Sequence, residues 1–139
     1  MPTAGPKPDD ALPDHEIVIR RVPTLHPRPD GKRVVSKGSF AASSKSRDPE
    51  EGMSVDSMSV LANSGIDPAD PAQFAPEVEV LMTLKVGDLH EHGMWVVPRP
   101  APHPAHCNVL GVTSSRRKIV LALSEFLRRP DDVVKTGEN

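Results

Sequence analysis

Hydrophobic positions along the chain fall into short runs that are separated by proline, glycine and polar residues. The first clear run, residues 16–22 (EIVIRRV), is rich in β-branched side chains and ends at Pro23. β-Branched residues favour strands, and proline cannot donate to a sheet ladder, so this run predicts a strand. Similar apolar or alternating runs predict further short strands at residues 34–35, 52–55, 78–86, 94–97 and 106–112.

Helix signals are brief in the first two thirds of the chain. Asp56 stands where its side chain would cap a short helix, and Gly65 is the expected end of that helix. Asp88 and Gly93 bracket about one further helical turn in the same way. Every second residue from 98 to 104 is a proline, which predicts an extended connector at this point.

The longest helix is expected after residue 114. Ser114 or Ser115 would cap this helix, and Pro130 would end it. Its apolar stripe consists of Ile119, Leu123, Phe126 and Leu127. Strands mixed with short helices, followed by one long helix, predict an α+β fold in which a small mixed or antiparallel sheet is packed by the C-terminal helix.

Both ends of the chain are polar. Residues 1–14 contain four prolines, and residues 131–139 end in Gly-Glu-Asn. Segments of this kind bury too little apolar surface to fold by themselves. We therefore expect a disordered N-terminal tail over residues 1–14, a single domain over residues 15–130 and a flexible C-terminal tail over residues 131–139.

Composition narrows the classes of partner. The net charge of −2 gives no global attraction to nucleic acid or to an anionic membrane, so we expect neither as a partner. The chain has a single cysteine, which excludes an intramolecular disulfide and favours the cytoplasm. Its apolar runs are all shorter than the roughly 18 residues of a membrane span, and the N-terminus lacks a signal-peptide pattern.

Four of the six histidines fall within seventeen residues. These are His90, His92, His103 and His106, and Cys107 follows the last of them. Imidazole and thiolate groups are zinc ligands, so a metal-binding protein is one hypothesis. A helical turn would point His90 and His92 about 200° apart, and a strand would point His106 and Cys107 to opposite faces. We therefore expect solvent-facing histidines and no metal site, with His106 as the one histidine placed to act in a site.

A second candidate site is the segment from Thr113 to Lys118. Backbone N–H groups at a helix start attract anions, and Ser114, Ser115, Arg116 and Arg117 lie there. Together with His106, these four residues are the expected ligand-binding residues, and a phosphate-bearing compound is the expected ligand. The alternative is that the cations are solvated or paired with carboxylates.

A third candidate comes from the order of residue types in the first half of the chain. Arg20 and Arg21 lie on the expected first strand, a Ser-rich segment follows at residues 36–46, and Glu79 comes later. This order resembles the skeleton of NAD-dependent ADP-ribosyltransferases. The resemblance implies that Arg20 or Arg21 holds the NAD phosphates and that Glu79 stabilises the transition state. It matches only the order of the residues, because the serines come too early and Glu77-Val78-Glu79 matches only the spacing of the family's motif.

Three short phrases carry one further resemblance: residues 39–41 (SFA), 53–56 (MSVD) and 104–106 (PAH). Together they resemble a pattern seen in small stand-alone bacterial proteins of unknown function, which implies a single compact domain in a prokaryotic cytoplasm. We assign no catalytic residue and no cofactor. The sequence favours a small non-enzymatic binding or accessory protein that acts through a protein partner or an anionic ligand. The alternatives are an NAD- or nucleotide-using transferase and a histidine-based metal-binding protein.

Overall fold

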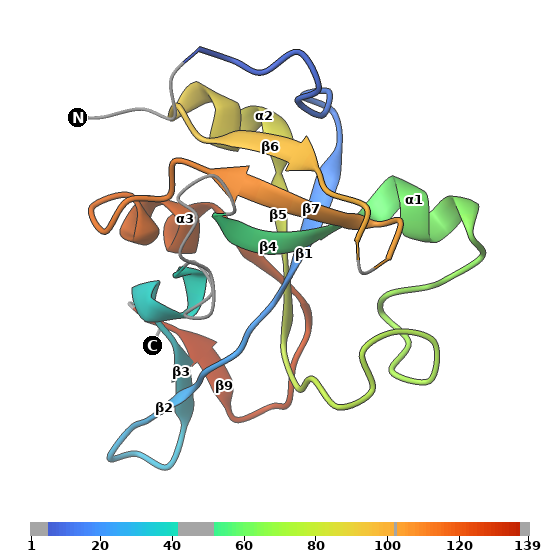
Figure 1. The fold of residues 1–139 in the computed structure, drawn as a ribbon. Helices are drawn as coiled ribbons and strands as arrows, with labels where there is room; N and C mark the ends of the chain where they lie inside the picture. The colour runs from blue at the N-terminus through green and yellow to red at the C-terminus, as the bar shows by residue number, and fades with distance from the viewer. Residues whose placement is uncertain (1–5, 42–51, 102, 137–139) are drawn as a thin grey trace.

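The computed structural model describes residues 6–41, 52–101 and 103–136, which form an α+β fold (Figure 1). A six-stranded sheet has the order β6-β7-β4-β1-β5-β8, and a three-stranded sheet has the order β2-β3-β9. The strands are β1 (Ile17–Arg21), β2 (His26–Pro27), β3 (Arg33–Val35), β4 (Met53–Ser57), β5 (Leu81–Lys85), β6 (Trp95–Pro98), β7 (His106–Leu110), β8 (Glu125–Arg128) and β9 (Val133–Lys135). The helical segments are η1 (Lys37–Phe40), α1 (Met58–Asn63), α2 (Val86–Glu91) and α3 (Arg117–Leu123).

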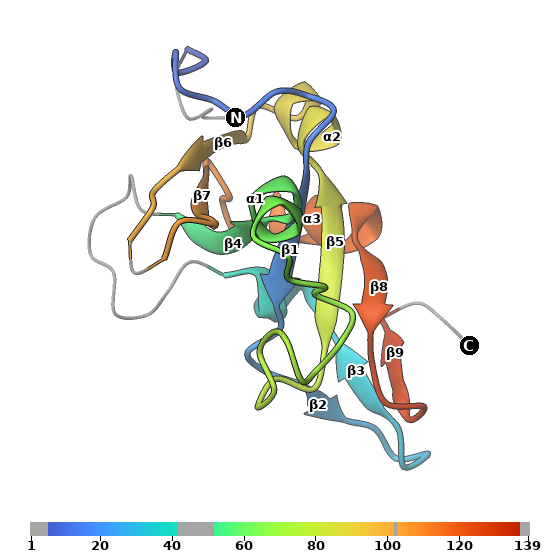
Figure 2. The same ribbon diagram turned by 90° about the vertical axis from the view of Figure 1, so that its right-hand side faces the viewer.

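Every neighbouring pair of strands in the large sheet is antiparallel, which confirms the expected fold class. Strand β1 lies in the middle and pairs with β5 along its whole length, from Ile17 opposite Lys85 to Arg21 opposite Leu81. Figure 2 shows β1, β5 and β8 running side by side. The small sheet is mixed, because β2 and β3 are antiparallel whereas β3 and β9 are parallel.

Both faces of the large sheet bury apolar side chains. Alternation along β1 sends Val18 to one face and Ile19 to the other, and both are fully buried. The face of Val18 packs against residues of η1, α2 and α3, including Phe40, Leu89 and Val120. The face of Ile19 is covered by α1 and the segment that follows it, through residues such as Leu61 and Phe74. Burial on both faces explains why the runs for β1 and β5 are so continuously apolar.

The glycine stops are confirmed. Gly65 follows α1 with φ of +75°, and Gly93 follows α2 with φ of +73°. Side chains disfavour this left-handed backbone, whereas glycine adopts it without a steric cost. The expected caps are wrong, because Ser57 rather than Asp56 caps α1 and accepts from the Val60 N–H at 3.3 Å. In α2 the cap position is Lys85, and Asp88 lies inside the first turn.

The long C-terminal helix is shorter than expected. Helix α3 ends at Leu123, because Ser124 is extended at φ −75° and ψ 147°. Phe126 and Leu127, the end of the expected helical stripe, lie instead in β8, which pairs with β5. The pattern fits both structures over so few residues, and pairing with a distant strand decides between them.

Parts of the two expected tails pack against the domain. Residues 133–135 form β9, in which Val133 is buried, and this strand pairs with β3. Near the N-terminus the Leu12 N–H donates to the Val96 carbonyl at 2.8 Å, and the Asp14 carbonyl accepts from Gly87 at 3.0 Å. The expected tail at residues 131–139 therefore contributes a strand, whereas residues 1–5 and 137–139 lie outside the described residues.

One irregularity in the large sheet positions the candidate site. Strands β1 and β4 pair only at Val18 opposite Ser57 and at Ile19 opposite Asp56. Beyond that point β1 continues to pair with β5, whereas the rest of β4 pairs only with β7. The two central strands therefore separate from Arg20 onward and leave a split within the sheet.

Candidate anion-binding cleft

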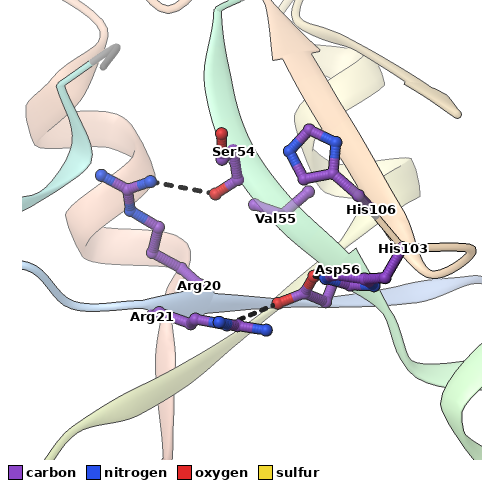
Figure 3. A pocket seen from close by; sticks show the side chains of 7 residues that line it. All are labelled: Arg20, Arg21, Ser54, Val55, Asp56, His103 and His106. Carbon is purple, nitrogen blue, oxygen red and sulfur yellow. Dashed lines mark hydrogen bonds and ion pairs between the residues drawn. The ribbon is translucent and has the colours of Figure 1, made fainter. Parts of the chain in front are cut away.

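The split between β1 and β4 opens into a cavity of about 290 Å³, which we call the cleft. The seven residues that line it are Arg20, Arg21, Ser54, Val55, Asp56, His103 and His106. Figure 3 shows the two arginines approaching from β1, three residues from β4, and the histidines from β7 and the loop before it. Charged and titratable side chains from three segments thus meet at one place.

Arg20 spans the split and is held entirely by backbone. Its Nη1 donates to the Ser54 carbonyl at 2.9 Å, and its Nε and Nη2 donate to the Ser39 carbonyl at 3.2 and 3.0 Å. Nη2 also donates to the Ala41 carbonyl at 3.2 Å. The residue is 8% exposed, and this burial lowers the pKa of its guanidinium to about 10 while the Asp56 charge partly opposes the shift. Arg20 is therefore a cation at neutral pH, with no carboxylate bonded to it among the described residues.

Asp56 forms the centre of the second group. One oxygen of its buried carboxylate, Oδ2, accepts from Arg21 Nε at 3.0 Å. The other, Oδ1, lies 3.0 Å from His103 Nε2. In the described part of the chain, Nη1 and Nη2 of Arg21 make no hydrogen bond, and the side chain is 39% exposed. The Arg21 fork is therefore oriented by Asp56 and keeps four N–H groups for a ligand.

His106 faces the cleft with one ring nitrogen fixed. Its Nδ1 lies 2.8 Å from the Arg99 carbonyl, which can only accept, so Nδ1 carries the hydrogen. In the neutral ring, Nε2 is then the atom with the lone pair. No described residue bonds to Nε2, which can therefore accept a proton or contact a ligand. The His103 and His106 rings lie edge to face, with centroids 6.1 Å apart.

Cations outnumber carboxylates in the cleft. Arg20 and Arg21 carry two positive charges, whereas Asp56 is the one carboxylate among the seven lining residues. With both histidines neutral, the lining therefore carries a net charge of +1. A cleft with this balance favours an anion, and a guanidinium fork matches the oxygens of a phosphate.

The structure does not bring the five expected ligand-binding residues into one site. His106 lies in the cleft at the first residue of β7, whereas Ser114, Ser115, Arg116 and Arg117 follow the other end of that strand. Arg116 is buried and donates to the Gly111 carbonyl at 3.0 Å, so this arginine serves the turn before α3. Neither serine caps α3, whose cap position is Arg116.

The four clustered histidines are also separated. His90 is buried on α2, so the expected solvent-facing position is wrong for this residue. Its Nδ1 lies 2.7 Å from Asp14, and its Nε2 accepts from the Val96 N–H at 3.3 Å. His92 follows α2 and is exposed, which matches the expected solvent-facing position. In residues 6–41, 52–101 and 103–136, no three histidine, cysteine or carboxylate groups are arranged to hold a metal. Cys107 is a free, buried cysteine.

The residues of the transferase skeleton are brought together only in part. Arg20 and Arg21 line the cleft, and Ser39 lies beside Arg20 through its carbonyl. Glu79 is not in the cleft, because it pairs with Arg33 at 2.7 Å and lines a different cavity. Serines 43, 44 and 46 lie outside the described residues. The role implied for Glu79 therefore does not fit the structure.

Two of the three short phrases, residues 53–56 and 104–106, supply lining residues of the cleft, and residues 39–41 contact it only through Arg20. Residues 39–41 bind the Arg20 guanidinium, residues 54–56 form one wall, and His106 completes the lining. Sequence reasoning interpreted Asp56 as a helix cap and missed its role between Arg21 and His103. Only the register that sets Asp56 opposite His106 on β7 could have indicated this position.

Comparisons with known proteins do not indicate a function, so the functional inference rests on the geometry of the cleft. No protein-family model, curated protein or solved structure matches this chain. Within the described ranges, every helix is too short or too polar to cross a membrane.

Proposed function

We propose that this protein binds a small phosphate-bearing ligand in the cleft and acts as a binding or accessory protein. One observation carries the proposal: Arg20 and Arg21 enter one cavity that has a single carboxylate in its lining. Arg21 supplies four uncommitted N–H groups, and buried Arg20 adds a fixed positive charge. The lone pair on His106 Nε2 would accept a hydrogen bond from a hydroxyl or other donor group of the ligand.

Calorimetric titration with inorganic pyrophosphate tests the proposal. Arg21→Gln removes the charge and the fork but keeps a polar side chain of similar length. Arg28→Gln is the matched control, because Arg28 is 36% exposed and also pairs with an aspartate, Asp30, at 2.8 Å. We expect Arg21→Gln to weaken binding at least about tenfold, the effect of losing one charge-assisted contact, and Arg28→Gln to leave it unchanged.

Ionic strength provides a second readout of the same titration. The affinity of the wild-type protein is expected to fall as salt rises, because the cleft is open to solvent and its charges are screened. No heat of binding at concentrations up to about 10 mM would overturn the proposal. Equal weakening by Arg21→Gln and Arg28→Gln would overturn it as well, because it would indicate adsorption to surface cations.

Catalysis on the bound ligand is a second candidate function, and the tautomer of His106 favours it. A lone pair fixed on Nε2 in an anion-binding cleft suits a general base. The activity would correspond to the NAD- or nucleotide-using transferase, with Arg21 on the phosphates and without a role for Glu79.

Chromatography of NAD or ADP after incubation with the protein tests the catalytic function. His106→Gln is expected to stop turnover while pyrophosphate binding persists, and Glu79→Ala is expected to leave turnover unchanged. Absence of turnover in the wild-type protein would leave binding as the function. A protein partner, the cytoplasmic location and the bacterial origin are further predictions from the sequence.

A further inference from the structure

We infer that the ligand is a nucleoside phosphate, whose base occupies a second cavity beside the cleft. This inference rests on the proposed function and adds the chemical class of the ligand. The second cavity has a volume of about 250 Å³. Its lining is mainly apolar and includes Val60, Ile66, Phe74, Pro104 and Ala105. We call it the apolar subsite.

The two cavities share part of their lining. Arg21 and His103 line both the cleft and the apolar subsite. One compound can therefore place an anionic group against the Arg21 N–H groups and an apolar group on the other side of the same side chain. A single small cavity holds only part of a drug-sized ligand, whereas two adjoining cavities reach the usual range of roughly 300–1,000 Å³.

The lining of the apolar subsite includes the Arg21 guanidinium and the Phe74 ring, two planar groups that favour a flat ligand group over an alkyl chain. The Arg21 guanidinium carbon lies 4.7 Å from the centre of the Phe74 ring, so its plane is already part of a cation–π pair. Nucleobases stack on guanidinium planes and aromatic rings, and in a nucleotide the ribose links the base to the phosphate. A nucleoside phosphate thus supplies both an anion for the cleft and a flat ring for the apolar subsite.

Parallel titrations with ADP and with pyrophosphate test the inference. Ser64 lines the apolar subsite and is exposed at the end of α1, so Ser64→Trp would fill the subsite from the surface. Asn63→Trp is the matched control, because Asn63 is the exposed neighbour in α1 and does not line the subsite. Far-UV circular dichroism verifies folding, and Ile66→Gln replaces Ser64→Trp if that variant does not fold.

We expect ADP to bind at least about tenfold more tightly than pyrophosphate, which is the effect of stacking one base. Ser64→Trp should remove this advantage without weakening pyrophosphate, and Asn63→Trp should preserve it. If pyrophosphate binding depends on Arg21 but ADP binds no more tightly, the inference is overturned and the proposed function stands. If Arg21→Gln leaves the binding of both pyrophosphate and ADP unchanged, the proposed function and the inference are both overturned.

Discussion

Arg21 Nε and the Asp56 carboxylate meet at 3.0 Å where the two central strands begin to separate. The Asp56 side chain is 5% exposed, whereas the Arg21 side chain is 39% exposed. The pair therefore runs from the interior of the sheet to the solvent, and the buried partner fixes the direction of the exposed one. Asp56 is a positioning residue for Arg21 and for His103 at the same time.

Replacement of Asp56 should cost stability as well as orientation. Asp56→Asn keeps the shape but loses the charge and one acceptor, so we expect a loss of about 2 kcal/mol in the free energy of unfolding. Urea denaturation followed by Trp95 fluorescence measures this loss. Asp30→Asn is the control, because the exposed Arg28–Asp30 pair should contribute less than about 1 kcal/mol. Equal losses in both variants would contradict the role of Asp56.

We expect Arg20 to contribute more to the stability of the fold than to ligand binding. Arg20→Met removes a donor set that satisfies the Ser39, Ala41 and Ser54 carbonyls. Buried polar groups without partners cost roughly 1–3 kcal/mol, so we expect the free energy of unfolding to fall by about 3 kcal/mol. Arg20→Lys should recover only part of this loss, because an ammonium group cannot reproduce the planar fork. Full recovery by lysine in urea denaturation would contradict the geometry.

Cys107 provides a pH-dependent test of the core. Burial, followed by the charges of Asp56 and Glu16, raises the pKa of this thiol to about 11 from an ordinary value of 9.0. The folded protein should therefore react with a disulfide reagent at pH 8 at less than about one tenth of the rate of the unfolded protein.

The same shift predicts a loss of stability at alkaline pH. The folded pKa lies above the unfolded one, so this contribution is complete below about pH 9 and is lost as pH rises toward 11. Urea denaturation at pH 8 and pH 10 should show a smaller decline in Cys107→Ala than in the wild-type protein. Identical declines would mean that the thiol is not protected.

His90 is expected to be a structural histidine. Both of its ring nitrogens are bonded, one to Asp14 and one to the Val96 N–H, and its ring lies 5.3 Å from Trp95. His90→Ala should lower the free energy of unfolding by about 2 kcal/mol, because it also leaves the Val96 N–H without an acceptor. His92→Ala, at an exposed position, should change it by less than about 0.5 kcal/mol. A larger effect at His92 in urea denaturation would reverse these assignments.

Local signals predicted much of the fold. The β-branched run before Pro23 identified β1, and the alternating residues after Gly52 identified β4. Gly65 and Gly93 marked the helix ends because a positive φ is a property of the residue itself. The change from helix to strand after Leu123 could not be predicted, because β8 depends on pairing with β5, about forty residues earlier.

The cleft was harder to predict than the fold, because its residues come from distant segments. The sequence singled out His106 and, as an alternative, Arg20 and Arg21, but no local sequence pattern indicates that these residues lie in one cleft. Arg21 and Asp56 meet because β1 and β4 are neighbours, and His106 joins them through the register of β7 against β4. The segment from Ser114 to Arg117 had the stronger local signal and lies at the other end of β7.

Side-chain NMR of the arginines and histidines during titration with ADP tests the central claim most directly. Binding in the cleft predicts that the Arg21 Nε–H and the His106 ring signals shift together and saturate with one dissociation constant. The signals of Arg116 and Arg117 should stay unchanged in the same spectra. Saturating shifts at Arg116 and Arg117, with Arg21 and His106 unchanged, would contradict the claim and would place the ligand at the start of α3.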